Sequence, residues 1–256
     1  RSKVQILPPQ PKMKKIVKKI FKNLGYDISK SFDESEIKNL TFDEIYKLKI
    51  KKNPVILDIG ANEGQSIHRF LKTFENPTIH AFEPNKNEFN NLKKNFSSNK
   101  NIILNNLALG EKKDIREFNI TSHSGNSSFI PINSDTDWIK KRSKQVGIDT
   151  KDYIQRTENI NIDTVDNYLT SKNINHVDLM KIDTQLFEDK VLEGSKNLLQ
   201  SRKVDAIEVE VVFSDAYKKY FSMSDIEKFL IPNKYRFSAI NLHNNNLFSG
   251  TIFFAD

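Results

Sequence analysis

A glycine-bearing turn follows the first strongly apolar segment and has the residue types of a nucleotide-binding loop. In VILDIGANEGQS, residues 55–66, Asp58 ends a buried strand, and Gly60 and Gly64 bracket a tight turn into a helix that begins near Gln65. Glycines let backbone approach a ligand closely, and a helix N-terminus offers free N–H donors. The order Gly-Ala-Asn-Glu-Gly lacks the three glycines of the dinucleotide fingerprint, so a pyrophosphate clamp is disfavoured.

An acidic residue closes the next predicted strand. HAFEP, residues 80–84, places Glu83 at the carboxyl end of that strand, 23 residues after Gly60. A carboxylate there can accept hydrogen bonds from both hydroxyls of a ribose. Asp58 or nearby backbone carbonyls can meet an ammonium group. The two motifs therefore favour a nucleoside with an amino-acid tail, which S-adenosylmethionine fits; the alternative is an ordinary turn between strand and helix.

Four segments together resemble the FkbM methyltransferase family: DIGANEG, AFEPNKNEFNNLKKN, NNLALG and LMKIDTQLFEDKVLEG. The similarity spans roughly residues 53–212. It implies an S-adenosylmethionine-dependent O-methyltransferase that acts on sugar or natural-product hydroxyls. It also implies an α/β, Rossmann-like class I methyltransferase fold with strand order 3-2-1-4-5-7-6. Residues of these segments are then expected to bind the cofactor: Asp58, Gly60, Ala61, Asn62, Gly64, Glu83, Pro84, Asn106, Ala108 and Asp183.

One position departs from the family pattern. Members commonly carry glycine after KIDVQ or KIDTQ, where this chain has Leu186, whereas Phe187 and Glu188 match. Leucine neither takes a positive φ cheaply nor leaves room for close backbone approach. A relaxed loop, a reshaped substrate pocket and impaired activity are all consistent with this change, and the matching neighbours favour the reshaped pocket.

Several acids are candidates for the catalytic chemistry. Methyl transfer needs an acceptor oxygen that is held near the methyl group and relieved of its proton. The resemblance places Asp183 beside the methyl group, as base or orienting group, although it could instead cap the following helix. Glu188 is a second candidate. In the strand AIEVEVV, residues 206–212, Glu208 and Glu210 share a face, and acids inside a strand are costly unless they meet cations, water or a ligand.

The segment SHSGNSS, residues 122–128, offers further polar candidates. His123 could act as a base near neutral pH, although a lone loop histidine is more often simply exposed. Ser127 and Ser128 match a serine pair of the family and are expected to contact cofactor or acceptor. Some O-methyltransferases bind Mg²⁺ at the end of the fourth strand, but the sequence shows no second ligand cluster, and we predict no metal site.

The elements around these residues alternate between strand and helix patterns, which predicts a mainly parallel sheet with helices on both faces. Strands are expected at 55–60, 78–83, 102–109, 177–183 and 206–212. Helices are expected near 64–75, 86–96, 189–200 and 224–230. Two last strands, 237–243 and 248–255, flank a turn of three asparagines and predict an antiparallel hairpin, which gives a seven-stranded sheet.

The chain divides into three predicted regions. Residues 1–12 are a leader or cloning remnant, residues 13–52 an N-terminal helical region, and residues 53–256 a methyltransferase domain with a substrate insertion near 119–160. In residues 13–24, apolar side chains recur at helical spacing among lysines, which predicts an amphipathic helix. This helix packs on its own domain, or it contacts an anionic membrane surface or a partner. Residues 1–22 hold eight of the 40 basic residues and no acid, so the remainder has 32 basic against 33 acidic residues.

Composition limits the classes of function. The chain has no cysteine, which excludes disulfides and thiolate metal sites. We expect a cytoplasmic enzyme, or one peripheral at the inner membrane surface, with a small-molecule or glycan acceptor and no nucleic-acid partner. A nucleic-acid methyltransferase is the first alternative, disfavoured because KIDT stands where amino-methylating enzymes tend to have N/D-P-P-Y/F. A weakly active S-adenosylmethionine-binding scaffold is the second, and Leu186 favours it.

Overall fold

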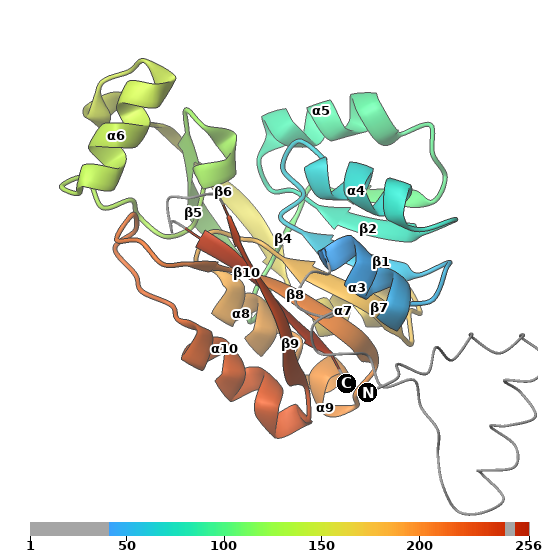
Figure 1. Cartoon of the computed structure of the whole chain (residues 1–256). Coiled ribbons are helices and arrows are strands. Elements are labelled where there is room, and N and C mark those ends of the chain that lie inside the picture. Colours follow the sequence, from blue (N-terminus) through green and yellow to red (C-terminus); the bar gives the residue numbers. More distant parts are fainter. Residues whose placement is uncertain (1–40, 244–248, 256) are drawn as a thin grey trace, which may run out of the picture. The chain divides into compact units, whose positions relative to one another are not determined.

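The computed structural model describes residues 41–243 and 249–255, and its centre is a seven-stranded sheet of order β3-β2-β1-β7-β8-β10-β9 (Figure 1). Strands β3, β2, β1, β7 and β8 run parallel, and β10 is antiparallel to both β8 and β9. In chain order this sheet is 3-2-1-4-5-7-6, so the predicted class I methyltransferase fold is confirmed. The strands are β1 (Val55–Ile59), β2 (Thr78–Phe82), β3 (Ile102–Asn105), β7 (Val177–Ile182), β8 (Val204–Val212), β9 (Arg236–His243) and β10 (Ser249–Ala255).

The two middle strands, β1 and β7, bring the site residues together. Their side chains are buried on both faces, as expected for strands covered by helices on either side. Asp58 lies opposite Lys181 and Ile59 opposite Ile182 in the parallel register. The two chains therefore leave the sheet side by side at its carboxyl edge.

Helices cover both faces of the sheet (Figure 1). One face carries α3 (Phe42–Lys49), α4 (Gln65–Thr73) and α5 (Lys86–Phe96), and the other carries α7 (Val165–Ser171), α8 (Glu188–Glu193), α9 (Lys196–Gln200) and α10 (Met223–Leu230), which the short η3 (Ile231–Asn233) follows. On the first face Tyr46 of α3 packs against Phe70 of α4 and Phe253 of β10. On the second face Leu192 of α8 and Ile226 of α10 are fully buried in a separate cluster.

A second, three-stranded sheet of order β4-β6-β5 lies beside the central one. It is built from β4 (Ala108–Leu109), β5 (Asp114–Thr121) and β6 (Ile154–Asp163). Between β5 and β6 lie η1 (Ser124–Asn126), α6 (Asp137–Val146) and η2 (Thr150–Asp152). We call residues 114–163 the insertion. The sequence located this segment near 119–160 but did not predict its strands.

Two predicted elements are each divided in the structure. The strand predicted at 102–109 is wrong as one element, because β3 and β4 belong to different sheets. Asn106 marks the turn between them, and its side-chain amide donates to the carbonyls of Glu83 and Pro84 at 2.9 and 3.0 Å. The helix predicted at 189–200 is likewise α8 and α9. Gly194 separates them, and a Cβ there would lie 1.9 Å from the carbonyl oxygen of Gly110.

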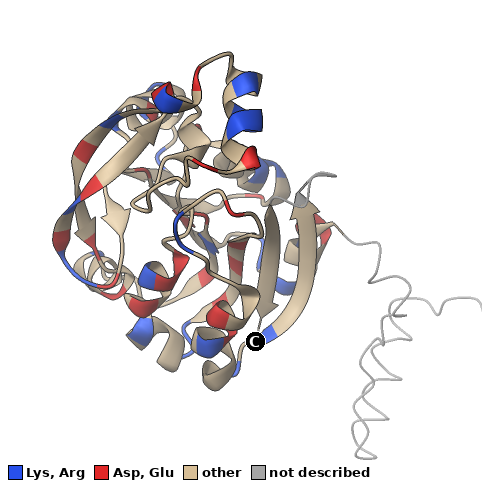
Figure 2. Ribbon diagram, turned by 90° about the vertical axis from the view of Figure 1, so that its left-hand side faces the viewer, with Lys and Arg blue, Asp and Glu red and all other residues tan. Residues whose placement is uncertain are grey.

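The predicted helix at 13–24 lies outside the described residues, as does the first part of the helix predicted at 32–50, whose last part is α3. Among residues 41–243 and 249–255, no helix combines the length and apolar character that a membrane span requires. Basic and acidic side chains both occur along the described ribbon, and basic residues predominate on α6 (Figure 2).

Candidate active site

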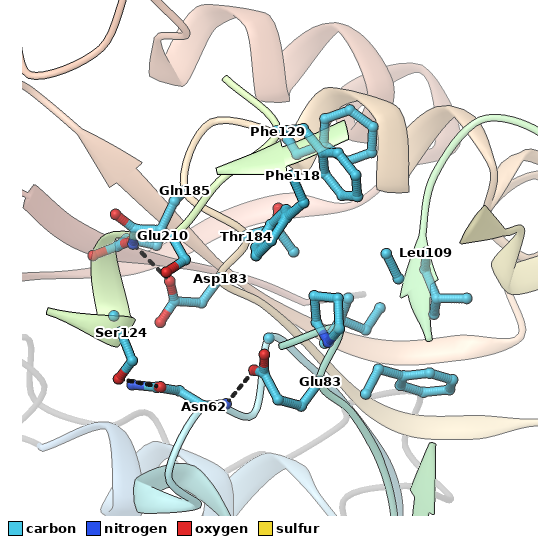
Figure 3. Close-up of a pocket in the computed structure, with 18 of the residues that line it drawn as sticks. Asn62, Glu83, Leu109, Phe118, Ser124, Phe129, Asp183, Thr184, Gln185 and Glu210 are labelled. Atoms are coloured by element: carbon cyan, nitrogen blue, oxygen red, sulfur yellow. Dashed lines mark hydrogen bonds between the residues drawn. The ribbon is translucent and has the colours of Figure 1, made fainter. Parts of the chain in front are cut away.

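A cavity of about 200 Å³ lies at the carboxyl ends of the parallel strands, between the central sheet and the insertion (Figure 3). Its polar groups come from five places: the loop after β1, the end of β2, η1, the loop after β7, and strand β8 itself. Aromatic side chains form the rest of the cavity wall. Its lining includes Gly60, Asn62, Glu83, Pro84, Leu107, Ala108, Phe118, Asn126, Ser127, Phe129, Asp183, Thr184, Gln185, Phe187 and Glu210.

Glu83 enters the cavity from the end of β2, as the sequence predicted for a ribose-binding carboxylate. One of its oxygens accepts the backbone N–H of Asn62 at 2.8 Å, and the other accepts that of Asn85 at 2.7 Å. Burial raises the pKa of Glu83 to about 7, against the lowering effect of these two N–H groups. A carboxylate oxygen has two acceptor sites, so each oxygen keeps capacity for one further donor.

The conformation of the loop after β1 is fixed by its neighbours in the fold. Gly60 has φ +83°, and a Cβ there would lie 1.8 Å from the carbonyl oxygen of Asp183, so close packing against the β7 loop requires glycine. Asn62, at φ 46°, accepts a hydrogen bond from the Ser124 hydroxyl at 2.9 Å. This hydrogen bond ties the loop to the insertion.

Asp58 does not line this cavity, although the sequence placed it beside the ligand's ammonium group. Its carboxylate is fully buried, accepts the Ser66 hydroxyl at 2.6 Å and lies 3.3 Å from the ammonium of Lys181. Lys181 also donates to the carbonyl of Gly60 at 2.8 Å and lies 3.5 Å from Asp183. Sequence reasoning missed Lys181; the signal was a buried lysine in a mainly apolar strand, which needs an anionic partner.

A second cavity, of about 280 Å³, shares Gly60, Asn62 and Asp183 with the first and extends toward α4. Arg69 of α4 and Glu208 of β8 face one another in it, with guanidinium-to-carboxylate distances of 2.8 and 2.9 Å. Glu208, a predicted catalytic candidate, is therefore held in an ion pair outside the first cavity. Residue types alone did not reveal Arg69 as its partner.

Asp183 and Glu210 form a carboxyl pair at the boundary between the two cavities (Figure 3). The side-chain amide of Gln185 donates to Asp183 at 3.0 Å and makes a short hydrogen bond to Glu210. Burial tends to raise the pKa of Asp183, but the charge of Lys181 and hydrogen bonds from Glu210 and Gln185 lower it below its usual value. Burial and the neighbouring Asp183 charge hold the pKa of Glu210 well above its usual value. Asp183 is therefore the more acidic carboxyl group of the pair.

The turn after Asp183 is strained and firmly held. Gln185 and Leu186 both have positive φ, 55° and 71°, so the leucine adopts a left-handed backbone conformation that glycine takes most easily. Its side chain is buried in the core beside α8 and α10, which offsets that strain. Glu188, another catalytic candidate, lies beneath the turn and accepts the backbone N–H and hydroxyl of Thr184 at 2.7 and 3.0 Å. Burial raises the pKa of Glu188 to about 7.

The other predicted residues divide between the two cavities and their surroundings. Pro84, Ala108 and Ser127 line the first cavity and Ala61 lines the second, whereas Gly64 and Asn106 line neither. A Cβ at Gly64 would lie 2.5 Å from the ring of Phe96, so packing on α5 accounts for that glycine.

His123 lies outside the first cavity, in a neighbouring polar groove, with its ring 3.0 Å from the guanidinium of Arg142. Partial burial and the Arg142 charge lower the pKa of His123, which makes it a weaker base. Ser128 is buried and donates to the carbonyl of Gln185 at 2.6 Å.

Comparison with known proteins identifies the family. The model of the FkbM methyltransferase domain matches residues 58–238, which contain the whole lining of the first cavity and that of the second except Thr251. The chain belongs to the FkbM methyltransferase family. It is therefore an S-adenosylmethionine-dependent methyltransferase, as the motifs predicted. No curated protein matches the sequence closely enough to count as a relative.

Solved structures resemble this FkbM methyltransferase at low sequence identity. A TehB-like methyltransferase of Corynebacterium glutamicum is 8% identical over 96% of this chain and 100% of its own, with a TM-score of 0.42. A precorrin-6y C5,15-methyltransferase of Geobacter metallireducens is 10% identical over 91% and 95%, with a TM-score of 0.43. Fibrillarin of Aeropyrum pernix, solved with S-adenosylmethionine, is 10% identical over 81% and 68%, with a TM-score of 0.42.

The two cavities fit the cofactor of an FkbM methyltransferase. The first presents the Glu83 carboxylate beside apolar and aromatic side chains, a set of groups suited to a nucleoside. The second presents Arg69 and Lys181 together with Glu208, a mixture of charges suited to a zwitterionic amino acid. Asp183 stands where they meet.

One group of possible metal ligands occurs elsewhere in the described residues. His176, Asp178 and Asp205 approach one another at the amino ends of β7 and β8, the opposite edge of the sheet from the cavities. Asp178 already pairs with Lys51 at 2.9 Å and accepts the backbone N–H of Val55 at 2.6 Å.

Proposed function

We propose that this FkbM methyltransferase methylates an oxygen, a hydroxyl group of a sugar, a glycan or a small natural product. The observation that carries the proposal is the Asp183 carboxylate at the meeting point of the two cavities, next to the Lys181 ammonium and hydrogen-bonded to Gln185. A carboxylate at that point can accept the proton of an acceptor hydroxyl. The remaining buried groups hold Asp183 in place and in its charged form.

The cofactor would span both cavities. Glu83 would accept the ribose hydroxyls in the first cavity, and Arg69, Lys181 and Glu208 would surround the amino-acid tail in the second. When bound, S-adenosylmethionine supplies an electrophilic methyl group on a sulfonium. The chain's own contribution is to fix the acceptor oxygen against that methyl group, which lowers the entropic cost of the reaction.

Asp183 would orient the acceptor and receive its proton. Lys181 neutralises part of the charge around Asp183 and Asp58, which keeps Asp183 ionised although it lies in a partly buried site. A carboxylate with a lowered pKa is a weak base. It therefore takes the proton late, as the acceptor oxygen becomes acidic during bond formation.

The first cavity also supports a polyhydroxylated or ring-shaped acceptor. Phe118, Phe129 and Phe187 form its aromatic wall, with ring centroids of neighbouring pairs 4.8 and 4.6 Å apart. Asn126 and Ser127 add polar groups from the insertion. Aromatic faces with a few convergent polar groups are typical of sites for small organic ligands.

The proposal can be tested with ¹³C-methyl-labelled S-adenosylmethionine and a panel of methyl glycosides, uronic acids, phenols and amines. We expect a new methyl signal with the chemical shift of a methyl ether. Asp183→Asn should lower kcat by about a hundredfold, the scale of losing a general base, and should leave the affinity for S-adenosylhomocysteine close to that of the wild type. A methylamine product, or unchanged turnover in Asp183→Asn, would contradict the proposal.

The scaffold alternative makes a different prediction in the same experiment. The scaffold alternative is supported by Leu186, which is buried and has a backbone conformation that favours glycine. A scaffold binds S-adenosylhomocysteine normally but transfers no label to any acceptor class. A methyl signal on RNA or DNA alone would instead support the nucleic-acid alternative.

A further inference from the structure

Gln185 makes two kinds of hydrogen bond through the two ends of its side-chain amide. Its nitrogen donates to Asp183 and to Glu210, and its oxygen accepts the hydroxyl of Tyr217 at 2.7 Å. The oxygen and nitrogen of an amide exchange places on a half turn of the side chain. A half turn here would place the amide oxygen against the Asp183 carboxylate, so the two orientations are not equivalent for the carboxyl pair.

Tyr217 supports the first of these orientations, because its hydroxyl can donate its one proton to the Gln185 oxygen. Its second partner is the backbone carbonyl of Asn126, at 3.1 Å, which can only accept. The phenol has one proton for these two acceptors, and the Gln185 oxygen is the nearer of them. Tyr217 is buried, and burial together with the charge near Glu210 raises its pKa well above the usual value, so the phenol keeps its proton.

We propose that Tyr217 is a positioning residue, which holds the Gln185 amide with its nitrogen toward the Asp183 and Glu210 carboxyl groups and so keeps Asp183 ionised for methyl transfer. The inference rests on the proposed role of Asp183. It assigns a function to the loop between β8 and α10, which the sequence did not single out.

The insertion is connected to the carboxyl pair through the same hydrogen bonds. The side-chain oxygen of Asn126 accepts the Tyr153 hydroxyl at 2.8 Å and lies 3.4 Å from the guanidinium of Arg142 on α6. The Tyr217 loop is also joined to the insertion by backbone hydrogen bonds, such as that from Lys218 to the carbonyl of Pro131 at 2.9 Å. A movement of the insertion would therefore be transmitted to the Gln185 amide.

Other charged groups surround Asp183 and must be considered in any titration. They are Lys181 on β7, Glu210 on β8, Asp58 on β1, Arg69 on α4 and Glu188 on α8. The Tyr217 hydroxyl, by contrast, is hydrogen-bonded to Gln185 and to the Asn126 carbonyl. Removal of that hydroxyl should therefore change the environment of Asp183 through Gln185.

The test is a pH titration of the ¹³C-labelled carboxyl groups by NMR in the full chain without cofactor or acceptor. Asp183→Asn and Glu210→Gln assign the two signals. In Tyr217→Phe we expect the Asp183 titration to move upward by about one pH unit, the size typical of a lost hydrogen bond to a carboxylate. Gln185→Leu should give a shift in the same direction and at least as large.

Tyr235→Phe is the matched control, because Tyr235 is equally buried and its hydroxyl donates to the carbonyl of Val204 at 3.0 Å, away from the cavities. It should leave the Asp183 titration unchanged. An unchanged titration in Tyr217→Phe, with a shift in Gln185→Leu, would overturn the inference. Slow hydrogen exchange of the Gln185 side-chain amide in the wild-type protein is expected as well, and rapid exchange would also contradict it.

These titrations need no turnover, so they separate this inference from the proposed function. If the protein shows the shift but transfers no methyl group, Tyr217 positions the amide and the enzymatic proposal fails. If Asp183→Asn abolishes turnover but Tyr217→Phe leaves both kcat and the titration intact, the enzymatic proposal stands and the inference fails.

Discussion

Replacing Glu83 with glutamine tests the proposed cofactor site at a residue whose hydrogen bonds the structure defines closely. Each oxygen of the Glu83 carboxylate already accepts a backbone N–H, from Asn62 and from Asn85. Glutamine keeps one acceptor oxygen and places an NH₂ group against one of these N–H donors. The variant therefore loses one backbone hydrogen bond and one of the two acceptors proposed for the ribose hydroxyls.

The size of the effect follows from the hydrogen bonds that glutamine cannot make. A hydrogen bond to a charged group contributes about 1.5–3 kcal/mol. The missing ribose hydrogen bond and the poorer loop geometry together should weaken binding by roughly 3 kcal/mol, which corresponds to about a hundredfold rise in Kd. Part of this effect would act through Asn62, since the same carboxylate holds that loop.

Isothermal titration calorimetry with S-adenosylhomocysteine at a pH well above the pKa of Glu83 measures this directly. Glu63→Gln is the matched control, because Glu63 lies in the same loop with an exposed side chain. We expect its Kd to stay close to that of the wild type. A wild-type Kd in Glu83→Gln, at an unchanged Tm, would refute the role of Glu83.

The buried charges and the strained turn lead to three more expectations. Burial raises the pKa of Glu83 to about 7, and ribose hydroxyls favour its ionised form. The Kd for S-adenosylhomocysteine should therefore rise by up to about tenfold per pH unit below that pKa and be constant well above it. A Kd that does not change with pH across that pKa would argue against the role of Glu83. Lys181→Met leaves Asp58 buried without its cation, so the free energy of unfolding measured in urea should fall by about 3–5 kcal/mol. Lys190→Met is the control: Lys190 is more exposed, and its replacement should lower the free energy of unfolding by less than about 1 kcal/mol. Leu186→Gly relieves backbone strain of about 1 kcal/mol but removes a buried side chain worth about 2–5 kcal/mol, so its Tm should fall, and a raised Tm would show that strain dominates.

Much of the central sheet could be predicted because its strands are short, apolar and followed by turn residues. The segments around 55–60 and 177–183 became β1 and β7 to within a residue, and α5 has the predicted bounds 86–96. The strand order came from the resemblance to the FkbM family rather than from periodicity. The second sheet was missed because β5 and β6 are rich in polar residues and half exposed, so they lack a clear apolar pattern.

The location of a site residue could be predicted where a motif places it at the end of a strand. It could be predicted less well where contacts between distant segments determine which way the side chain points. Glu83 lines the cavity because the end of a parallel strand always meets that edge of the sheet. Asp58 turned away from the cavity because Lys181, far along the chain, lies opposite it in the register. The pairing of Glu208 with Arg69 and the hydrogen bond of Tyr217 to Gln185 also join distant segments, so spacing alone could not reveal them.

A crystal structure with S-adenosylhomocysteine would test the central claim most directly. We expect ribose hydroxyls on Glu83, the amino-acid tail beside Arg69 and Glu208, and the sulfur next to Asp183. A nucleoside bound away from Glu83, or a tail that leaves the second cavity empty, would contradict this placement of the cofactor.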